Sequence, residues 1–465
     1  MSKQTLILGV VGSIRSNHKN MDKLKDMIEK SKSSEELNQF IKESNLIYSN
    51  TDIGIAHALV GAVTNNSKIE LVCITNLFAH QNLNLYGEVL NYDSIEDLED
   101  IDTLSINDNE YKILLEKVKN ADGVILGTPV YFGDRSSVAN KFLQLTQKFE
   151  LLKDKAFGVI SCGAKRNGGQ ETTNIYSLYE ALMQDSVVIG NGPASCQYGG
   201  TIWAGDVGKA VDDDFGNLTS YGTGRQVAHL ASILKAGEEK NEKVKITVLV
   251  TMDTEENKYL NIVKEYFDKY SNKDVELEIF TLIKENIYRC IACEVCPSPK
   301  FVEKYKDEEY PYHCIIQTKQ DSMKFIQEKL VNRDGIVLVG VNSKEDLTYR
   351  YQSFMERTRF IRHDDFELTN TPIIGLLINE LGATNNPIFN VKVLTSFIRH
   401  NTFFLKPFEI VMNNEEVIFE NSFVDVIAKL KKIKSGRNAI TALDVSYKAT
   451  GYKNKQLDNT VKSRR

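Results

Sequence analysis

The stretch GVILGTPVYFGDRSSVANKFLQLTQ, residues 123–147, is the most informative part of the sequence about the fold. It opens with a short apolar run that is typical of a buried parallel strand. The run breaks at Thr128-Pro129, an aromatic pair and Gly133 follow, and a helical pattern begins near Ser136. Open α/β sheets bind ligands at the carboxyl edge, where a strand turns toward a helix. Because this turn is apolar and lacks a catalytic side-chain set, it favours a flat cofactor; an ordinary strand–helix loop is the alternative.

Length and composition indicate a protein of two or three domains with a large core. The chain has 465 residues, of which 42% are hydrophobic and 26% charged, and a net charge of −6. This charge gives no reason to expect nucleic acid, and no apolar run approaches the roughly 20 residues of a membrane helix. Seven cysteines in so long a chain do not form a disulfide framework. We therefore expect a cytoplasmic, reducing location.

Two short polar motifs in the N-terminal region predict a phosphate loop that is split by an insertion. A first strand, residues 5–11, runs into GSIRS, which offers Ser13, Arg15 and free backbone N–H groups. A helical hairpin is predicted at about residues 17–47, and Ser49-Asn50-Thr51 then begins another helix. We interpret GSIRS and SNT as two halves of one loop. The alternative is that SNT only caps its helix.

Taken together, these motifs and DGVILGTPVYFG resemble the flavodoxin-like NAD(P)H-dependent FMN reductase superfamily. GGQE, residues 168–171, is similar to the loop of the tryptophan-repressor-binding-protein type of quinone reductase. The match covers nearly all of residues 1–237, and the helical hairpin is its departure from the family. The resemblance implies a doubly wound parallel sheet in which the first motif holds the FMN phosphate and the later loops border the ring. The cofactor-binding residues that it implies are Ser13, Arg15, Ser49, Asn50, Thr51, Thr128, Pro129, Val130, Tyr131, Phe132, Gly133, Gly163, Gly168, Gly169 and Tyr198.

The sequence then begins again, which predicts two tandem flavodoxin-like domains. A charged linker at 238–243 precedes a second domain at 244–436, in which NRDGIVLVG, residues 332–340, echoes NADGVILG, residues 120–127. The second copy has acids where GSIR stood and lacks TPVYFG, so we expect it to hold no FMN of its own. Residues 437–465 are predicted to be a basic tail, disordered or partner-binding.

The second domain carries a compact cysteine motif. Cys290, Cys293 and Cys296 form CxxCxxCP, and Cys314 follows. Three thiolates at this spacing with a distant fourth can ligate a [4Fe–4S] cluster. The motif resembles that of the iron–sulfur flavoproteins, although the gap to Cys314 is longer here. A structural zinc site and buried cysteines without a ligand are the alternatives.

The predicted function is an FMN-dependent oxidoreductase. It would move electrons between NAD(P)H or a ferredoxin-like donor and a quinone, small-molecule or protein acceptor. A non-catalytic, partner-binding scaffold of flavodoxin fold is the alternative. The two copies suggest an intrachain pseudo-dimer, which could assemble further into a homo-oligomer. Asp212-Asp213-Asp214 is interpreted as a solvated acidic loop, with a cation site as the alternative. Trp203 either stacks near the ring or simply packs.

Overall fold

A computed structural model describes most of the chain. The described residues are 4–74, 108–193, 195–238, 242–293, 312, 314–345, 349–362 and 366–443. The chain divides into a first unit, Met1–Asn191 with Gln197–Ala236, and a second unit, Gly192–Cys196 with Gly237–Arg465. Cys296 and the tail from residue 444 lie outside the described residues, so the predictions made for them stay predictions.

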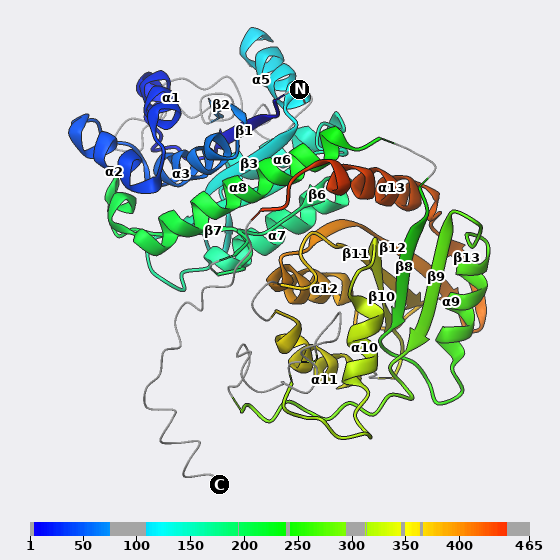
Figure 1. The fold of residues 1–465 in the computed structure, drawn as a ribbon. Coiled ribbons are helices and arrows are strands. Elements are labelled where there is room, and N and C mark those ends of the chain that lie inside the picture. Colours follow the sequence, from blue (N-terminus) through cyan, green and yellow to red (C-terminus); the bar gives the residue numbers. More distant parts are fainter. Residues whose placement is uncertain are drawn as a thin grey trace. The chain divides into compact units, whose positions relative to one another are not determined.

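The first unit is an α/β layer structure around a parallel sheet (Figure 1). Its elements are β1 (Leu6–Val11), η1 (His18–Asn20), α1 (Met21–Lys30), α2 (Ser34–Glu43), α3 (Asn50–Thr64), β2 (Lys68–Cys73), α5 (Asp108–Asn120), β3 (Gly123–Tyr131), β4 (Asp134–Arg135), α6 (Ser137–Lys148), β5 (Ala156–Gly163), α7 (Gln170–Met183), β6 (Val187–Val188), β7 (Gly200–Trp203), η4 (Lys209–Asp212) and α8 (Asp214–Ala236). The strands follow the order β2-β1-β3-β5-β6, and these neighbours pair in parallel. This is the order of a flavodoxin-like sheet.

Helices cover both faces of this sheet. α3 and α8 lie side by side on one face (Figure 1), where a Cβ at Gly127 would meet Ile55 of α3 at 2.5 Å and one at Gly158 would meet Val227 of α8 at 2.6 Å. On the opposite face, the Ser161 hydroxyl donates to the carbonyl of Gln170, the first residue of α7. The glycines in the strands therefore allow helices to approach the sheet closely. The sheet and helices together bury a continuous apolar core.

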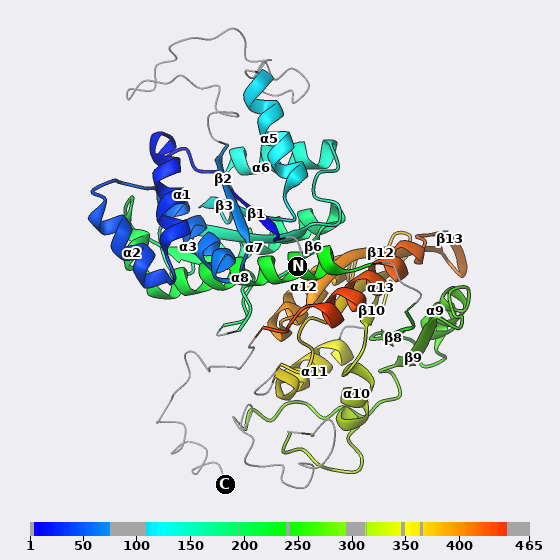
Figure 2. The same ribbon diagram turned by 45° about the horizontal axis from the view of Figure 1, so that its top comes forward.

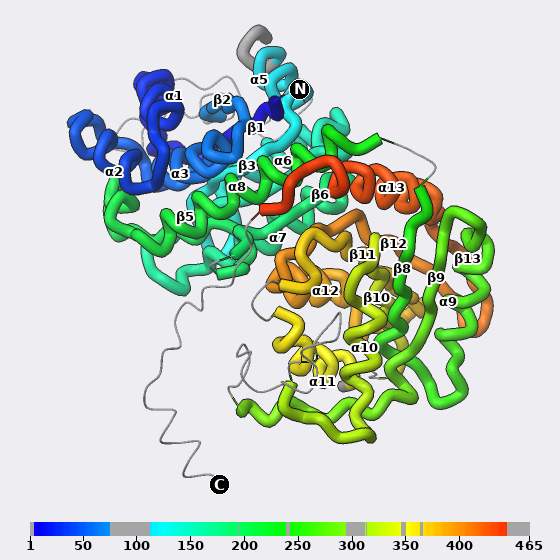
Figure 3. The backbone as a smooth tube through the Cα atoms, viewed as in Figure 1, coloured from blue at the N-terminus to red at the C-terminus, as the bar shows by residue number. Residues whose placement is uncertain are grey.

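The helical hairpin α1–α2 follows β1 and precedes α3 (Figure 2). Each helix buries two aliphatic side chains, Leu24 and Ile28 in α1 and Leu37 and Ile41 in α2. This spacing of four residues places each pair on one helical face. The continuous tube of Figure 3 shows the chain leaving β1, passing through the hairpin and returning at α3.

The second unit repeats the same alternation of strands and helices. Its elements are β8 (Val244–Val250), α9 (Lys258–Asp268), β9 (Val275–Thr281), α10 (Met323–Leu330), β10 (Gly335–Asn342), α11 (Tyr349–Arg357), η7 (Thr358–Arg362), β11 (Pro372–Glu380), α12 (Phe389–Phe397), η8 (Ile398–His400), β12 (Phe403–Asn413), β13 (Glu416–Glu420) and α13 (Val424–Ala439). The strands run β9-β8-β10-β11-β12 in parallel, and β13 pairs antiparallel with β12. Among the described residues, no helix is long and apolar enough to cross a membrane.

Candidate functional site

The carboxyl ends of β1 and β3 meet the N-terminus of α3 in the first unit. The N–H of Gly12, just after β1, donates to the carbonyl of Gly127 in β3 at 2.9 Å. A Cβ placed on Gly127 would lie 3.1 Å from the methyl group of Thr51 in the first turn of α3. Ligands bind at such an edge in open α/β sheets, and a helix N-terminus there favours an anion.

The structure brings the two predicted halves of the phosphate loop to this edge. Ser13 is buried and begins a turn in which the N–H of Ser16 donates to its carbonyl at 3.0 Å. Ser49 is the N-cap of α3, and the N–H groups of Asn50 and Thr51 have no bonded acceptor among the described residues. Arg15 is a central residue of this turn and is exposed. Free N–H groups at a helix start with a nearby guanidinium fit a phosphate.

Asp52, a residue that the sequence analysis did not select, holds these halves together. Its carboxylate is fully buried. It accepts hydrogen bonds from the Ser16 hydroxyl at 2.5 Å, the Asn17 N–H at 3.1 Å and the Ser49 N–H at 2.8 Å. Burial raises the pKa of Asp52, against the opposing effect of these bonds. The Ser-x-x-Asp spacing of a capping box was the available signal.

The Asn50 side chain is already bonded within the first unit. Its amide nitrogen donates to the carbonyl of Asp206 at 2.8 Å, and its amide oxygen accepts from the N–H of Ala210 at 3.1 Å. Both ends of the amide therefore fasten the loop between β7 and α8. What Asn50 offers to an anion is its backbone N–H.

The predicted ring-binding turn is the tip of a tight β-hairpin formed by β3 and β4. Val130 pairs with Arg135 and Tyr131 with Asp134. Phe132 and Gly133 between them both have positive φ, 52° and 80°, as a two-residue type I′ turn requires. A bulky residue rarely adopts this conformation. The Phe132 side chain is also fully exposed, so a strained backbone presents an aromatic ring to solvent at the carboxyl edge.

The Gly168–Gly169 loop lies against this hairpin. Gly169 has a φ of 101°, and a Cβ on it would lie 2.8 Å from the Cα of Gly133. Gln170 shapes the loop, because its amide accepts from the Gly168 N–H at 2.8 Å and donates to the carbonyls of Lys165 and Ile202 at 2.8 and 3.1 Å. The two predicted ring-binding segments are thus in direct contact.

Tyr198 is not brought to the same place. It is buried, and the next residue, Gly199, lies beside Val159 in the middle of β5, where a Cβ would meet the Val159 carbonyl at 2.3 Å. The carboxyl end of β5, at Gly163, is four residues further on. The assignment of Tyr198 to the cofactor site stays a prediction.

The aspartates at 212–214 do not form a uniformly solvated loop. Asp213 is buried, and its carboxylate pairs with Arg166 at 2.5 Å and accepts from the N–H of Trp203 at 2.6 Å. The Arg166 guanidinium lies 5.8 Å from the ring centroid of Trp203 and 5.5 Å from that of Phe215. The interpretation as a solvated acidic loop is therefore wrong for Asp213, because this side chain is buried and forms an ion pair with Arg166. The spacing of the two residues in the sequence does not predict the pair.

Three of the four predicted metal ligands line one cavity in the second unit. Cys290, Cys293 and Cys314 surround a cavity of about 20 Å³ together with Arg357. Cys314 is buried, and the other two thiols are half-buried. Among the described residues, which omit Cys296, no group of three His, Cys, Asp or Glu side chains has the geometry of a metal site. The three thiols therefore share a cavity without forming a metal site among the described residues, and the four-cysteine ligand set stays a prediction.

A buried ion pair supports the cysteine segment. Arg357 and Asp321 are 1% exposed and form a bidentate pair, with N–O distances of 2.7 and 3.0 Å. Arg357 also bonds the Tyr288 carbonyl at 2.7 Å and the Tyr312 hydroxyl at 2.8 Å. Burial would lower the pKa of Arg357, but Asp321 and neighbouring Tyr312 and Cys314 raise it. The guanidinium thus stays charged beside the cysteine cavity.

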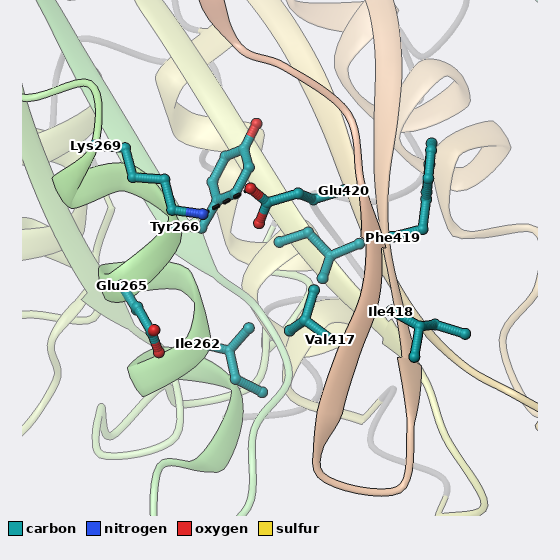
Figure 4. Close-up of a pocket in the computed structure, with 9 residues that line it drawn as sticks. Ile262, Glu265, Tyr266, Lys269, Val417, Ile418, Phe419 and Glu420 are labelled. Atoms are coloured by element: carbon teal, nitrogen blue, oxygen red, sulfur yellow. Dashed lines mark hydrogen bonds and ion pairs between the residues drawn. The ribbon is translucent and has the colours of Figure 1, made fainter.

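A larger hollow in the second unit has no such chemistry. A hollow of about 380 Å³ lies between α9 and β13. Figure 4 shows the residues that line it, among them aliphatic side chains and the Lys269–Glu420 ion pair, whose atoms are 2.6 Å apart. Val417 and Ile418 on β13 are exposed there. The hollow offers no nucleophile or paired acid–base set, so it is not a candidate active site.

The first unit matches proteins of known class. Residues 48–195 match the model of the family described as NADPH-dependent FMN reductase, and the match begins just before α3. A NAD(P)H dehydrogenase (quinone) of Trichlorobacter lovleyi is 30% identical over 138 residues, which are 26% of this chain and 67% of that protein. The chain belongs, through its N-terminal half, to the flavodoxin-like FMN reductase family. The predicted resemblance is confirmed for that half.

Two iron–sulfur flavoproteins are similar to the chain over stretches of comparable length. An iron–sulfur flavoprotein of Methanocaldococcus jannaschii is 35% identical over 127 residues, 26% of this chain and 65% of that protein. An iron–sulfur flavoprotein of Methanosarcina thermophila is 28% identical over 138 residues, which are 29% of this chain and 68% of that protein. The chain thus spans about two thirds of the length of these relatives. Among solved structures, a WrbA-like flavodoxin of Agrobacterium tumefaciens is 15% identical, with a TM-score of 0.27, over 49% of this chain and 98% of that one.

Proposed function

We propose that the protein is an FMN-dependent oxidoreductase whose first unit holds one FMN at the carboxyl edge of its sheet. One observation carries the proposal: an anion-binding helix start and an exposed aromatic hairpin lie at the ends of neighbouring strands. The phosphate would bind at Ser13, Arg15 and the N–H groups of Asn50 and Thr51. A molecule with a phosphate at one end and a flat ring at the other suits this combination, and the family of the first unit supports it.

The residues of the chain would position the cofactor and control its surroundings. Bound FMN supplies hydride acceptance and transfer of one or two electrons. The Thr128–Gly133 turn and the Gly168–Gly169 loop would border the ring, where fixed backbone dipoles favour its reduced, anionic form. Cys162 is not expected to act as a nucleophile, because burial raises the pKa of its thiol to about 12 despite a hydrogen bond with Thr51.

The test is to remove any bound cofactor from the protein and then to titrate FMN into it. Trp203 is the only tryptophan of the sequence and lies in the first unit, so its fluorescence should be quenched as a flavin absorbance band appears. Stopped-flow mixing with NADH and NADPH, and then with quinones, identifies the donor and acceptor. A colourless protein that binds no FMN would contradict the proposal and favour the scaffold alternative.

We further propose that the second unit is a second flavodoxin-like domain that binds a [4Fe–4S] cluster in place of FMN. The repeated strand order supports the duplication. The cavity that Cys290, Cys293 and Cys314 line together supports the cluster. Iron, sulfide and zinc analysis of anaerobically purified protein tests it. Cys293→Ser should lower the iron content, whereas Cys73→Ser in β2 is the control. A chain with two FMN and no iron would contradict this proposal.

A further inference from the structure

The helical hairpin separates the two halves of the predicted phosphate loop along the chain. Asn17 and Asp52 are 35 positions apart, so the turn at residues 13–17 is not held at the start of α3 by a short connection. A longer connection leaves more conformations open to the turn, and the free-energy cost of closing it rises with its length. Some interaction must therefore fix the turn, and the Asp52 carboxylate is placed to provide it.

Asp52 makes more bonds than helix capping needs. The capping box uses the Ser49 hydroxyl, which accepts from the Asp52 N–H at 3.1 Å, and the Asp52 carboxylate, which accepts from the Ser49 N–H at 2.8 Å. The bonds from the Ser16 hydroxyl and the Asn17 N–H lie outside that motif and reach the other side of the hairpin. One carboxylate therefore joins the residues that precede and follow the hairpin.

The Asp52 carboxylate lies close to the place where the phosphate is proposed to bind. A buried carboxylate at the start of α3 competes with any anion that binds there, because both carry negative charge. Ser16, Asn17 and Ser49 donate to the carboxylate and leave the N–H groups of Asn50 and Thr51 without a bonded acceptor among the described residues. The Asp52 charge acts on two neighbours: it partly offsets the lowering of the His18 pKa by burial, and it adds to the effect of burial that raises the pKa of Tyr48.

We propose that Asp52 is a positioning residue for the phosphate end of the flavin site: it clamps the 13–17 turn to the N-terminus of α3 across the helical hairpin. The inference rests on the proposed function. Asp52 itself touches no cofactor and acts through Ser16, Asn17 and Ser49. Its loss should therefore weaken the binding of the phosphate and leave the binding of the ring nearly unchanged.

The test compares FMN with riboflavin, which has the same ring and no phosphate, on the full-length protein. In Asp52→Asn, an amide group faces N–H donors, so we expect the Kd for FMN to rise about 10-fold or more while the Kd for riboflavin changes much less. Ser16→Ala keeps the capping box and removes one bond of the clamp, so it should show the same selectivity to a smaller extent.

Glu36→Gln is the matched control. Glu36 accepts from the Lys32 N–H at 2.7 Å at the start of α2, and its own N–H donates to Ser33, so the change weakens a helix cap in the hairpin without touching the 13–17 turn. It should leave the ratio of the two Kd values as in the wild type.

Two results would overturn the inference alone. One is an Asp52→Asn protein that loses affinity for both flavins by the same factor, and the other is a wild-type ratio in Ser16→Ala. Ser16→Ala keeps the test decisive if Asp52→Asn does not fold. A wild-type protein that binds neither flavin would instead overturn the proposed function.

Discussion

His57 couples the helical hairpin to α3 and should make the first unit sensitive to acid. Its imidazole is fully buried. Nδ1 lies 3.1 Å from the Ser34 hydroxyl and Nε2 lies 3.0 Å from the Asn38 amide oxygen, both on α2. A neutral ring satisfies both contacts, with Nε2 donating and Nδ1 accepting. Burial lowers the pKa of His57 to about 3.

The lowered pKa of His57 makes the free energy of unfolding decrease at acidic pH. Because the folded pKa lies below the ordinary value of 6.5, the unfolded chain takes up a proton at a higher pH than the folded chain does. Stability is therefore complete above pH 6.5 and is lost as the pH falls from 6.5 toward 3. One such group costs about 1.4 kcal/mol per pH unit in that window, which amounts to about 2 kcal/mol between pH 7.5 and 5.0.

The assay uses Trp203 as the reporter of the first unit. Urea unfolding of wild type and His57→Gln is followed by tryptophan fluorescence at pH 7.5 and pH 5.0. The wild type should lose about 2 kcal/mol more than the variant. His229, whose pKa burial lowers to about 4, is present in both proteins and cancels in this comparison.

His400→Gln is the matched control. Burial lowers the pKa of His400 to about 3, but this residue lies in the second unit. The change should therefore leave the pH dependence of the Trp203 transition as in the wild type. If the loss of unfolding free energy differs between wild type and His57→Gln by no more than about 0.5 kcal/mol, His57 is not the source of the acid sensitivity.

Three further predictions test other parts of the molecule. Gly169→Ala should weaken FMN binding, because a Cβ at a φ of 101° would lie 2.8 Å from Gly133. Gly205→Ala is the control, since a Cβ there would have no atom within 4 Å. Flavin titration measures the affinity of both variants. Arg357→Leu leaves Asp321 buried without its partner and should destabilise the second unit by about 3–5 kcal/mol, measured by circular dichroism in urea, with the exposed Arg359→Leu as control. Phe132→Gly removes the strain of a φ of 52° and should stabilise the first unit by about 1 kcal/mol, followed by Trp203 fluorescence; an unchanged or lower stability would contradict that account.

Local patterns predicted the framework of the first unit. The apolar runs at 5–11 and 123–127 lie in β1 and β3, because a strand buried on both faces must be apolar along its length. The hairpin at 17–47 is present as α1 and α2, since its apolar residues recur at helical spacing. The glycines at 133 and 169 adopt the positive φ that only glycine accepts at low cost.

Contacts between distant segments were not predictable in the same way. No local pattern indicates that the Asn50 amide bonds to the 206–210 loop, or that Asp213 pairs with Arg166. The partners in these bonds are separated by 156 and 47 positions. No periodicity or motif spacing joins such residues, so an exposed aspartate and a buried one look alike in the sequence.

The strands, the turns and the residue types at the carboxyl edge could be predicted from the sequence, since each depends on interactions among near neighbours. Which polar groups remain free and which are already bonded depends on the tertiary structure. Asp52 joins both sides of the hairpin, and Arg357 and Asp321 form a buried pair beside the cysteine cavity. A buried charge is unfavourable unless it is paired or hydrogen-bonded. Which residue serves as its partner depends on how the folded chain brings distant segments together.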